Sequence, residues 1–76
     1  EEKITAYPNP ATGDVFIQGY DLSKGTIVLR DCLGQVVRNW KGDNEPMNIA
    51  DLPQGIYFLT LNYMEVSTVV QLVKVE

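Results

Sequence analysis

Short runs of alternating apolar and polar residues recur along this chain, and Gly, Pro, Asn and Asp separate each run from the next. Apolar residues at the i, i+3, i+4, i+7 spacing of an amphipathic helix are never sustained, whereas strict alternation is typical of half-buried strands. The pattern therefore predicts an all-β fold of about seven short antiparallel strands with no substantial helix.

The turn residues on either side of each run set the expected strand boundaries. We expect strands at residues 3–7, 14–18, 26–32, 35–40, 46–49, 55–63 and 66–75. The run 55–63 has apolar residues on both faces, so we expect it in the centre of a sheet. The run that begins with Pro46 is expected at an edge, because proline cannot donate to a strand ladder.

The length of the chain limits its architecture. A chain of 76 residues buries only about 60% of its unfolded surface. Without a helix to cover a sheet, two sheets packed face to face are the arrangement that buries the apolar sides of both. We expect an immunoglobulin-like β-sandwich. No linker or repeat divides the sequence, so residues 1–76 are expected to form a single domain.

The segment Pro8-Asn9-Pro10 interrupts regular structure between the first two strands. Each proline fixes its own φ and lacks a backbone donor, so neither a helix nor a central strand can run through the segment. A break of this kind passes the chain from one sheet to the other. A recognition stripe, or a stiff joint beneath a preceding domain, is the alternative interpretation.

Two further motifs predict tight turns with structural roles. Asp31 and Gly34 occupy the first and fourth positions of a hairpin turn, where Asp bonds the backbone ahead and Gly accepts positive φ. Leu52, Gly55 and Tyr57 are similar to the tyrosine corner of Greek-key sandwiches. In that corner the ring seals one end of the core and its hydroxyl bonds the backbone.

The charge and hydropathy exclude several classes of function. The formal net charge is −4 and the six Lys and Arg residues are dispersed, which leaves no basic surface for nucleic acid. No apolar run approaches the roughly 20 residues that span a bilayer, and the first residues lack the features of a signal peptide. We therefore expect a chain that does not span a membrane, and that is either cytoplasmic or part of a larger protein with its targeting signal elsewhere.

Candidate catalytic and metal-binding residues are sparse. The sequence has no histidine and one cysteine, Cys32, so an internal disulfide is impossible and the thiol has no evident base. The acids Asp31, Asp43, Glu45 and Asp51 lack the spacing of a calcium loop and are expected to be solvated or bonded to local backbone. We expect no cofactor and no enzymatic activity.

Three aromatic residues, Tyr20, Trp40 and Tyr63, could form a platform that stacks on sugars. Nothing in their spacing places them on one surface, and packing at the edge of the core is the expected role of Trp40 and Tyr63. An accessory fibronectin III-like or carbohydrate-binding module of a secreted enzyme or adhesin stays open as an alternative function.

Three stretches in this order, YPNPATGDVFI, VLRDCLGQVV and LPQGIYFLTL, precede a last strand that ends LVKVE. Together they resemble the C-terminal sorting domain of cargo proteins exported by the type IX, or Por, secretion system of Bacteroidetes. The likeness covers nearly the whole chain. The positions that match the family motifs are Pro8, Asn9 and Pro10, then Asp31 and Gly34, then Leu52, Gly55 and Tyr57. Family members often carry a lysine in the middle of the last strand, where this chain has Gln71.

The resemblance implies an immunoglobulin-like sandwich at the tail of a larger exported protein, which crosses the periplasm and reaches the cell surface or the medium. The implied partners are the N-terminal cargo domain, the outer-membrane secretion apparatus and a sortase-like peptidase. That peptidase commonly removes the domain when it anchors the cargo. The domain would act as a sorting signal through its surface, without catalysis.

The last strand is the expected recognition element, because it is long and Lys74 is its only charge. Backbone pairing at an exposed edge would supply affinity. The candidate recognition residues are Val66, Thr68, Val70, Leu72 and Lys74. Pairing of this edge with a second copy of the chain would instead give an edge-strand dimer.

Overall fold

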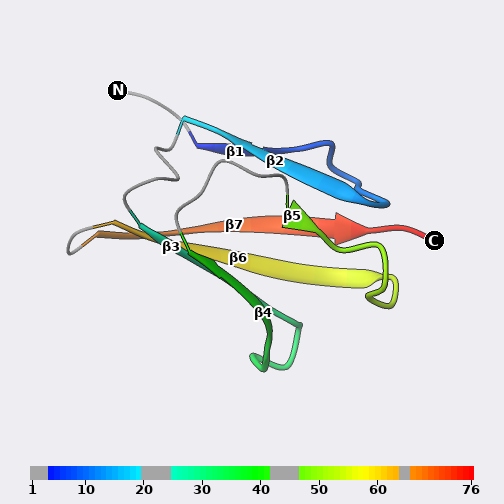
Figure 1. Cartoon of the computed structure of the whole chain (residues 1–76). Helices are drawn as coiled ribbons and strands as arrows, with labels where there is room; N and C mark the ends of the chain where they lie inside the picture. Colours follow the sequence, from blue (N-terminus) through cyan, green and yellow to red (C-terminus); the bar gives the residue numbers. More distant parts are fainter. Residues whose placement is uncertain (1–3, 20–24, 42–46, 64–65) are drawn as a thin grey trace.

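Strands account for all the regular structure in the described part of the computed structural model, which comprises residues 4–19, 25–41, 47–63 and 66–76 (Figure 1). The strands are β1 (Thr5–Tyr7), β2 (Asp14–Gln18), β3 (Thr26–Arg30), β4 (Val36–Lys41), β5 (Met47–Asn48), β6 (Gly55–Tyr63) and β7 (Val66–Lys74). No helix occurs in these ranges, which confirms the predicted all-β fold.

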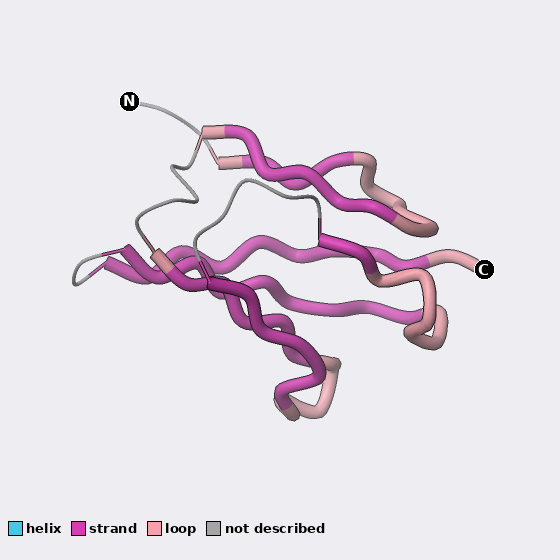
Figure 2. Tube along the Cα trace, in the orientation of Figure 1, coloured by secondary structure: helices cyan, strands magenta, loops and turns pink. Residues whose placement is uncertain are grey.

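The strands form two sheets that lie one above the other (Figure 2). The smaller sheet has the order β1-β2-β5 and the larger has the order β4-β3-β6-β7, and every named strand pair is antiparallel. The 55–63 strand lies between β3 and β7, as its two apolar faces predict, and β5 lies at an edge. The two-sheet architecture is therefore confirmed, while the immunoglobulin-like form stays a prediction.

Several strand ends differ from the predicted boundaries. β3 ends at Arg30 rather than at residue 32, because Asp31 already begins the turn. β4 begins at Val36, one residue later than predicted, and extends to Lys41. β1 begins at Thr5 and β7 ends at Lys74, so both are shorter than predicted. Lys3 and Pro46, the predicted first residues of two strands, lie outside the described residues.

One hydrophobic core joins the two sheets. Its buried members come from the small sheet, from the large sheet and from the loops: Ala6, Ala11, Val15, Ile27, Leu29, Met47, Ile49, Tyr57, Leu59, Leu61 and Leu72. Along β6 the residues Tyr57, Leu59 and Leu61 are at most 5% exposed, and the residues between them are half-buried. This alternation follows from the pleat of a strand, which sends successive side chains to opposite faces.

Candidate functional site

The last strand, β7, forms one edge of the four-stranded sheet, and its side chains divide into two rows. Leu72 and Lys74 are 0% and 1% exposed, and Thr68 and Val70 are half-buried on the same inner row. The side chain of Val66 lies outside the described residues. Four of the five residues that the sequence put forward for recognition, Thr68, Val70, Leu72 and Lys74, lie on this inner row, and their part in recognition stays a prediction.

The outer row of β7 is the one that a partner can reach. Ser67 and Gln71 are exposed, and Val69 is 61% exposed, which is high for a large apolar side chain. Sequence reasoning missed this row because the alternation alone does not say which set of residues faces inward. The register between β6 and β7 decides it.

Lys74 is the largest fully buried side chain among the described residues. Its amine donates to the carbonyl of Val75 at 3.4 Å, which is longer than the ordinary N–H···O distance of about 2.9–3.0 Å. The sequence identified Lys74 only as the single charge of the proposed recognition strand. The structure instead uses the long aliphatic stem of Lys74 as core packing.

The segment of residues 8–11 lies against the edge of β7, close to the C-terminal end of that strand (Figure 1). The Asn9 carboxamide donates to the carbonyl of Gln71 at 3.0 Å and accepts the N–H of Val73 at 3.0 Å. Asn9 therefore bonds β7 in the way that a neighbouring strand would. Both peptide bonds that precede the prolines, Tyr7-Pro8 and Asn9-Pro10, are cis.

Ala11 continues this pairing toward the end of the chain. Its N–H donates to the carbonyl of Val73 at 2.8 Å, and its carbonyl accepts the N–H of Val75 at 2.9 Å. The bridge between Ala11 and Lys74 is parallel, and Ala11 has no exposed surface. The predicted passage from one sheet to the other at this break is wrong, because β1 and β2 pair with each other in the same sheet. The sequence predicted the break but not that it would pair with the last strand. The signal available was Asn9 itself, whose side chain offers both a donor and an acceptor between two residues that lack a backbone donor.

The tyrosine motif lies where β6 begins. The hydroxyl of Tyr57 donates to the carbonyl of Pro53 at 2.6 Å, and its ring is only 5% exposed. This is the backbone bond that a tyrosine corner requires. Leu52 is half-buried and packs against the core, and Gly55 is the first residue of β6.

The hairpin motif joins β3 to β4. The Asp31 carboxylate accepts the N–H of Leu33 at 2.9 Å and that of Gln35 at 3.0 Å, and the Asp31 carbonyl accepts the N–H of Gly34 at 3.0 Å. Gly34 has φ of 87°, a conformation that side chains with a Cβ rarely adopt. The turn chemistry of both residues is therefore structural.

The hairpin residues also affect the pKa of Tyr57. Burial raises the pKa of the Tyr57 hydroxyl above its ordinary value of 10.0, and the charges of Asp31 and then Cys32 raise it further. The neutral phenol is thus the form that the fold stabilises. It is also the form that can donate to Pro53.

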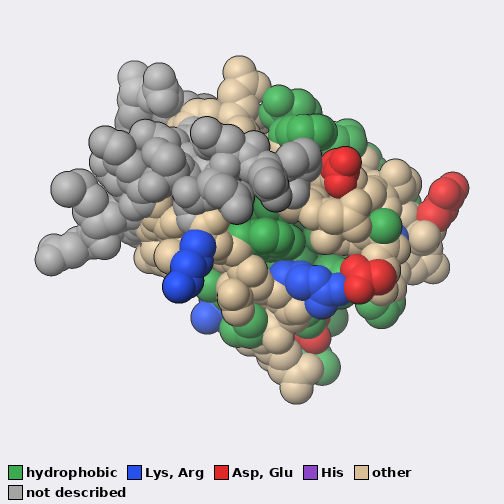
Figure 3. Space-filling model, in the orientation of Figure 1, with side chains coloured by type: hydrophobic (Ala, Val, Ile, Leu, Met, Phe, Trp, Pro, Cys, Tyr) green, Lys and Arg blue, Asp and Glu red, His purple; other side chains and the backbone are tan. Residues whose placement is uncertain are grey.

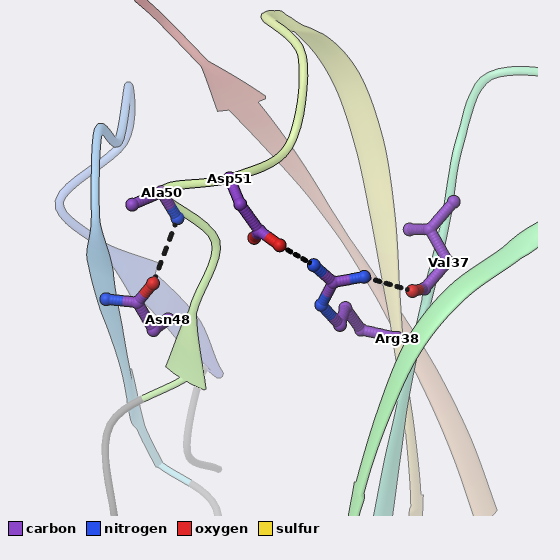
Figure 4. A network of polar contacts seen from close by, with 5 residues as sticks. All are labelled: Val37, Arg38, Asn48, Ala50 and Asp51. Carbon is purple, nitrogen blue, oxygen red and sulfur yellow. Dashed lines mark hydrogen bonds and ion pairs between the residues drawn. The ribbon is translucent and has the colours of Figure 1, made fainter.

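A polar network joins the two sheets on the side of β4 (Figure 4). The guanidinium of Arg38 pairs with Asp51 in the loop that follows β5, and it also donates to the carbonyl of Val37 at 2.8 Å. Where this loop begins, the side-chain oxygen of Asn48, the last residue of β5, accepts the N–H of Ala50 at 3.1 Å. Asp51 is 70% exposed, so we interpret this pair as a surface link between layers.

The remaining candidates from the sequence do not gather into one place. Cys32 is exposed in the hairpin turn. In the described ranges, no group of three or more His, Cys, Asp or Glu side chains could hold a metal ion, and Asp43 and Glu45 lie outside those ranges. Trp40 packs against the core, while Tyr20 and the Tyr63 side chain are outside the described residues.

An exposed aromatic pair lies on the small sheet. Tyr7 and Phe16 face each other across β1 and β2 with ring centroids 5.6 Å apart, and they are 48% and 41% exposed. On the face shown in Figure 3, charged side chains lie scattered among uncharged atoms without a continuous patch of either sign. The described surface is thus one of strand edges, turns and scattered apolar residues.

These features define a two-sheet β module whose distinctive elements are an edge strand and its turns. Residues 5–75 match the family described as the secretion system C-terminal sorting domain. The chain belongs to this family, the C-terminal sorting signal of cargo exported by type IX secretion. No curated protein and no solved structure matched the chain.

Membership of this family establishes what kind of protein the chain is. A sorting domain is a signal recognised by the type IX machinery and is not itself a catalyst. The protein that carries it is secreted, to the cell surface or beyond. The accessory-module alternative is not favoured. Within the described ranges, no helix has the length and apolar character needed to cross a membrane.

Proposed function

We propose that residues 1–76 form one folded unit at the tail of a larger exported protein. The export apparatus recognises the surface of this unit, which catalyses no reaction itself. The cargo precedes the domain. The unit passes through the periplasm with its cargo, engages the outer-membrane apparatus, and is then removed by a sortase-like peptidase as the cargo is attached at the cell surface. It needs no cofactor for any of these steps.

The observation that carries this proposal is the edge position of β7. The strand lies at the side of the four-stranded sheet and runs from Val66 to Lys74, with a single ionisable side chain that is buried. Soluble proteins commonly protect an edge with exposed lysines, prolines or bulges. Outside the part that residues 8–11 cover, the described edge has no such protection and is suited to recognition by another protein.

A secretion assay tests the proposal. Residues 1–76 are fused behind an inner-membrane export signal and a reporter protein, and the fusion is expressed in a bacterium with a working type IX system. We expect the reporter in the medium or on the cell surface. The matched control is the same fusion with Leu72→Asp, which buries a charge in the core and should prevent folding. Retention of the unmodified fusion in the periplasm would contradict the proposal.

A further inference from the structure

The outward edge of β7 has two parts that differ in their hydrogen bonding. Val73 donates to Asn9 and accepts from Ala11, so its backbone groups point away from β6. In an antiparallel pair the direction of these groups alternates along the strand. The N–H and C=O of Ser67 and Val69, and the N–H of Gln71, therefore also point outward.

The C-terminal part of this edge is covered by the segment of residues 8–11, as described above. The N-terminal part, residues 67–71, we call the open edge. Among the described residues, none pairs with the outward groups of Ser67 or Val69, and the side chain of Val69 is 61% exposed. The 8–11 segment shows that this edge accepts an extended chain, since Ala11 already pairs with it in β fashion.

The chemistry of the open edge restricts its occupant. Unpaired N–H and C=O groups along a strand are best satisfied by the backbone of another extended segment. Between Ile56 and Val73, the described residues of β6 and β7 include no Asp, Glu, Lys or Arg, so these strand residues offer no ion pair to a charged partner. A partner residue beside Val69 must cover an exposed apolar side chain.

We propose that the open edge is a strand-acceptor site, which binds an uncharged extended segment of the export machinery as an added strand. The inference rests on the proposed function. The 8–11 segment determines where the added strand must stop, because Asn9 already bonds Gln71 and Val73. The added strand extends the four-stranded sheet and places an apolar side chain beside Val69.

Substitutions at Val69 test the site in the secretion assay. Val69→Pro removes a backbone donor that points away from β6, so the β6–β7 ladder keeps its hydrogen bonds. Val69→Lys keeps the backbone and places a charge on the open edge. Val69→Thr is the conservative control. Val36→Lys adds the same charge on β4, the opposite edge strand of the same sheet, at a residue that is 52% exposed.

We expect Val69→Pro to lower secretion of the reporter about tenfold, which corresponds to the loss of about one net hydrogen bond. We expect Val69→Lys to lower it by a similar factor, because its charge would lie beside the apolar side chain of the added strand. Val69→Thr and Val36→Lys should secrete near the level of the unmodified fusion. Circular dichroism of each purified variant establishes whether it is folded. If Val69→Pro does not fold, Val69→Lys decides the question.

The outcomes separate the two proposals. A retained unmodified fusion would overturn the proposed function and this inference with it. Secretion of the unmodified fusion and of folded Val69→Lys at equal levels would overturn the strand-acceptor site alone. Sedimentation of the purified chain tests whether a second copy of the chain occupies the open edge instead. We expect a monomer, and a dimer that Val69→Lys dissociates would overturn the inference by assigning the open edge to a second copy.

Discussion

The side-chain oxygen of Asn9 accepts the backbone N–H of Val73 at 3.0 Å, across 64 positions of the sequence. Together with the bond from Asn9 to Gln71, it ties the connection between β1 and β2 to the last strand. These bonds lie at the surface, so each has a modest net value.

The first prediction concerns this tie. Asn9→Ala should lower the free energy of unfolding by about 1–2 kcal/mol, since both bonds are lost. Asn9→Asp keeps the acceptor for Val73 but turns a carboxylate toward the carbonyl of Gln71, so we expect a loss of similar size. Urea denaturation measures both. A variant as stable as the unmodified chain would show that the carboxamide contributes nothing.

The second prediction concerns the bond between Tyr57 and Pro53. Tyr57→Phe keeps the ring in the core and removes the hydroxyl, so the Pro53 carbonyl loses the hydrogen bond that it accepts from Tyr57. We expect the free energy of unfolding to fall by about 0.5–1.5 kcal/mol at neutral pH. Tyr7→Phe is the control, because the Tyr7 ring is 48% exposed, and its thermal midpoint should stay near that of the unmodified chain.

The third prediction is a pH dependence with a defined sign. The pKa of Tyr57 is raised in the folded state above the ordinary value of 10.0, so folding disfavours the phenolate. The contribution of neutral Tyr57 to the free energy of unfolding is complete below about pH 10 and is lost as pH rises through the pKa of Tyr57 in the folded state. The unmodified chain should therefore lose stability more steeply than Tyr57→Phe above that pH. Parallel alkaline curves would contradict the prediction.

The fourth prediction concerns the hairpin turn. A Cβ added at Gly34 meets no atom within 4 Å, so any cost of Gly34→Ala comes from its φ of 87°. We expect a loss of about 1–2 kcal/mol. Asp31→Asn retains an acceptor oxygen for Leu33 and Gln35 and should cost less than Asp31→Ala. Chemical denaturation of the three variants gives the order, and a neutral Gly34→Ala would refute the backbone argument.

The fifth prediction concerns the buried lysine. The amine of Lys74 makes a long contact with the Val75 carbonyl, which recovers little of its desolvation cost. Lys74→Met fills the same space without the charge, so we expect the free energy of unfolding to be unchanged or higher by about 1 kcal/mol. Lys74→Ala should cost about 2 kcal/mol or more through lost packing. A strongly destabilised Lys74→Met would instead show that the amine is needed.

Local sequence patterns were enough to predict the architecture. The strands at residues 14–18 and 55–63 have the predicted boundaries, because alternation and flanking turn residues act within a few positions. The hydrogen bonds of Asp31 and Tyr57 also join residues that are at most four positions apart. Features of this kind can be predicted from sequence because each depends on neighbours in the chain.

Long-range relationships could not be read in the same way. The pairing of Ala11 with Val73 and Val75 depends on how the two sheets are placed, and no local pattern encodes it. The inward direction of Leu72 and Lys74 follows from the register between β6 and β7, and a shift of one residue would reverse it. The burial of Lys74 could not be predicted either, since lysine side chains in folded proteins are mostly exposed.

The bonds of Asn9 and Ala11 have a consequence for biosynthesis. Both residues are synthesised dozens of codons before the groups that they bond, which lie between Gln71 and Val75. A polypeptide cut short by a premature stop codon before Gln71 has no partner for its own opening segment. A cell that exports only chains with the finished fold would thereby reject truncated translation products without inspecting the cargo.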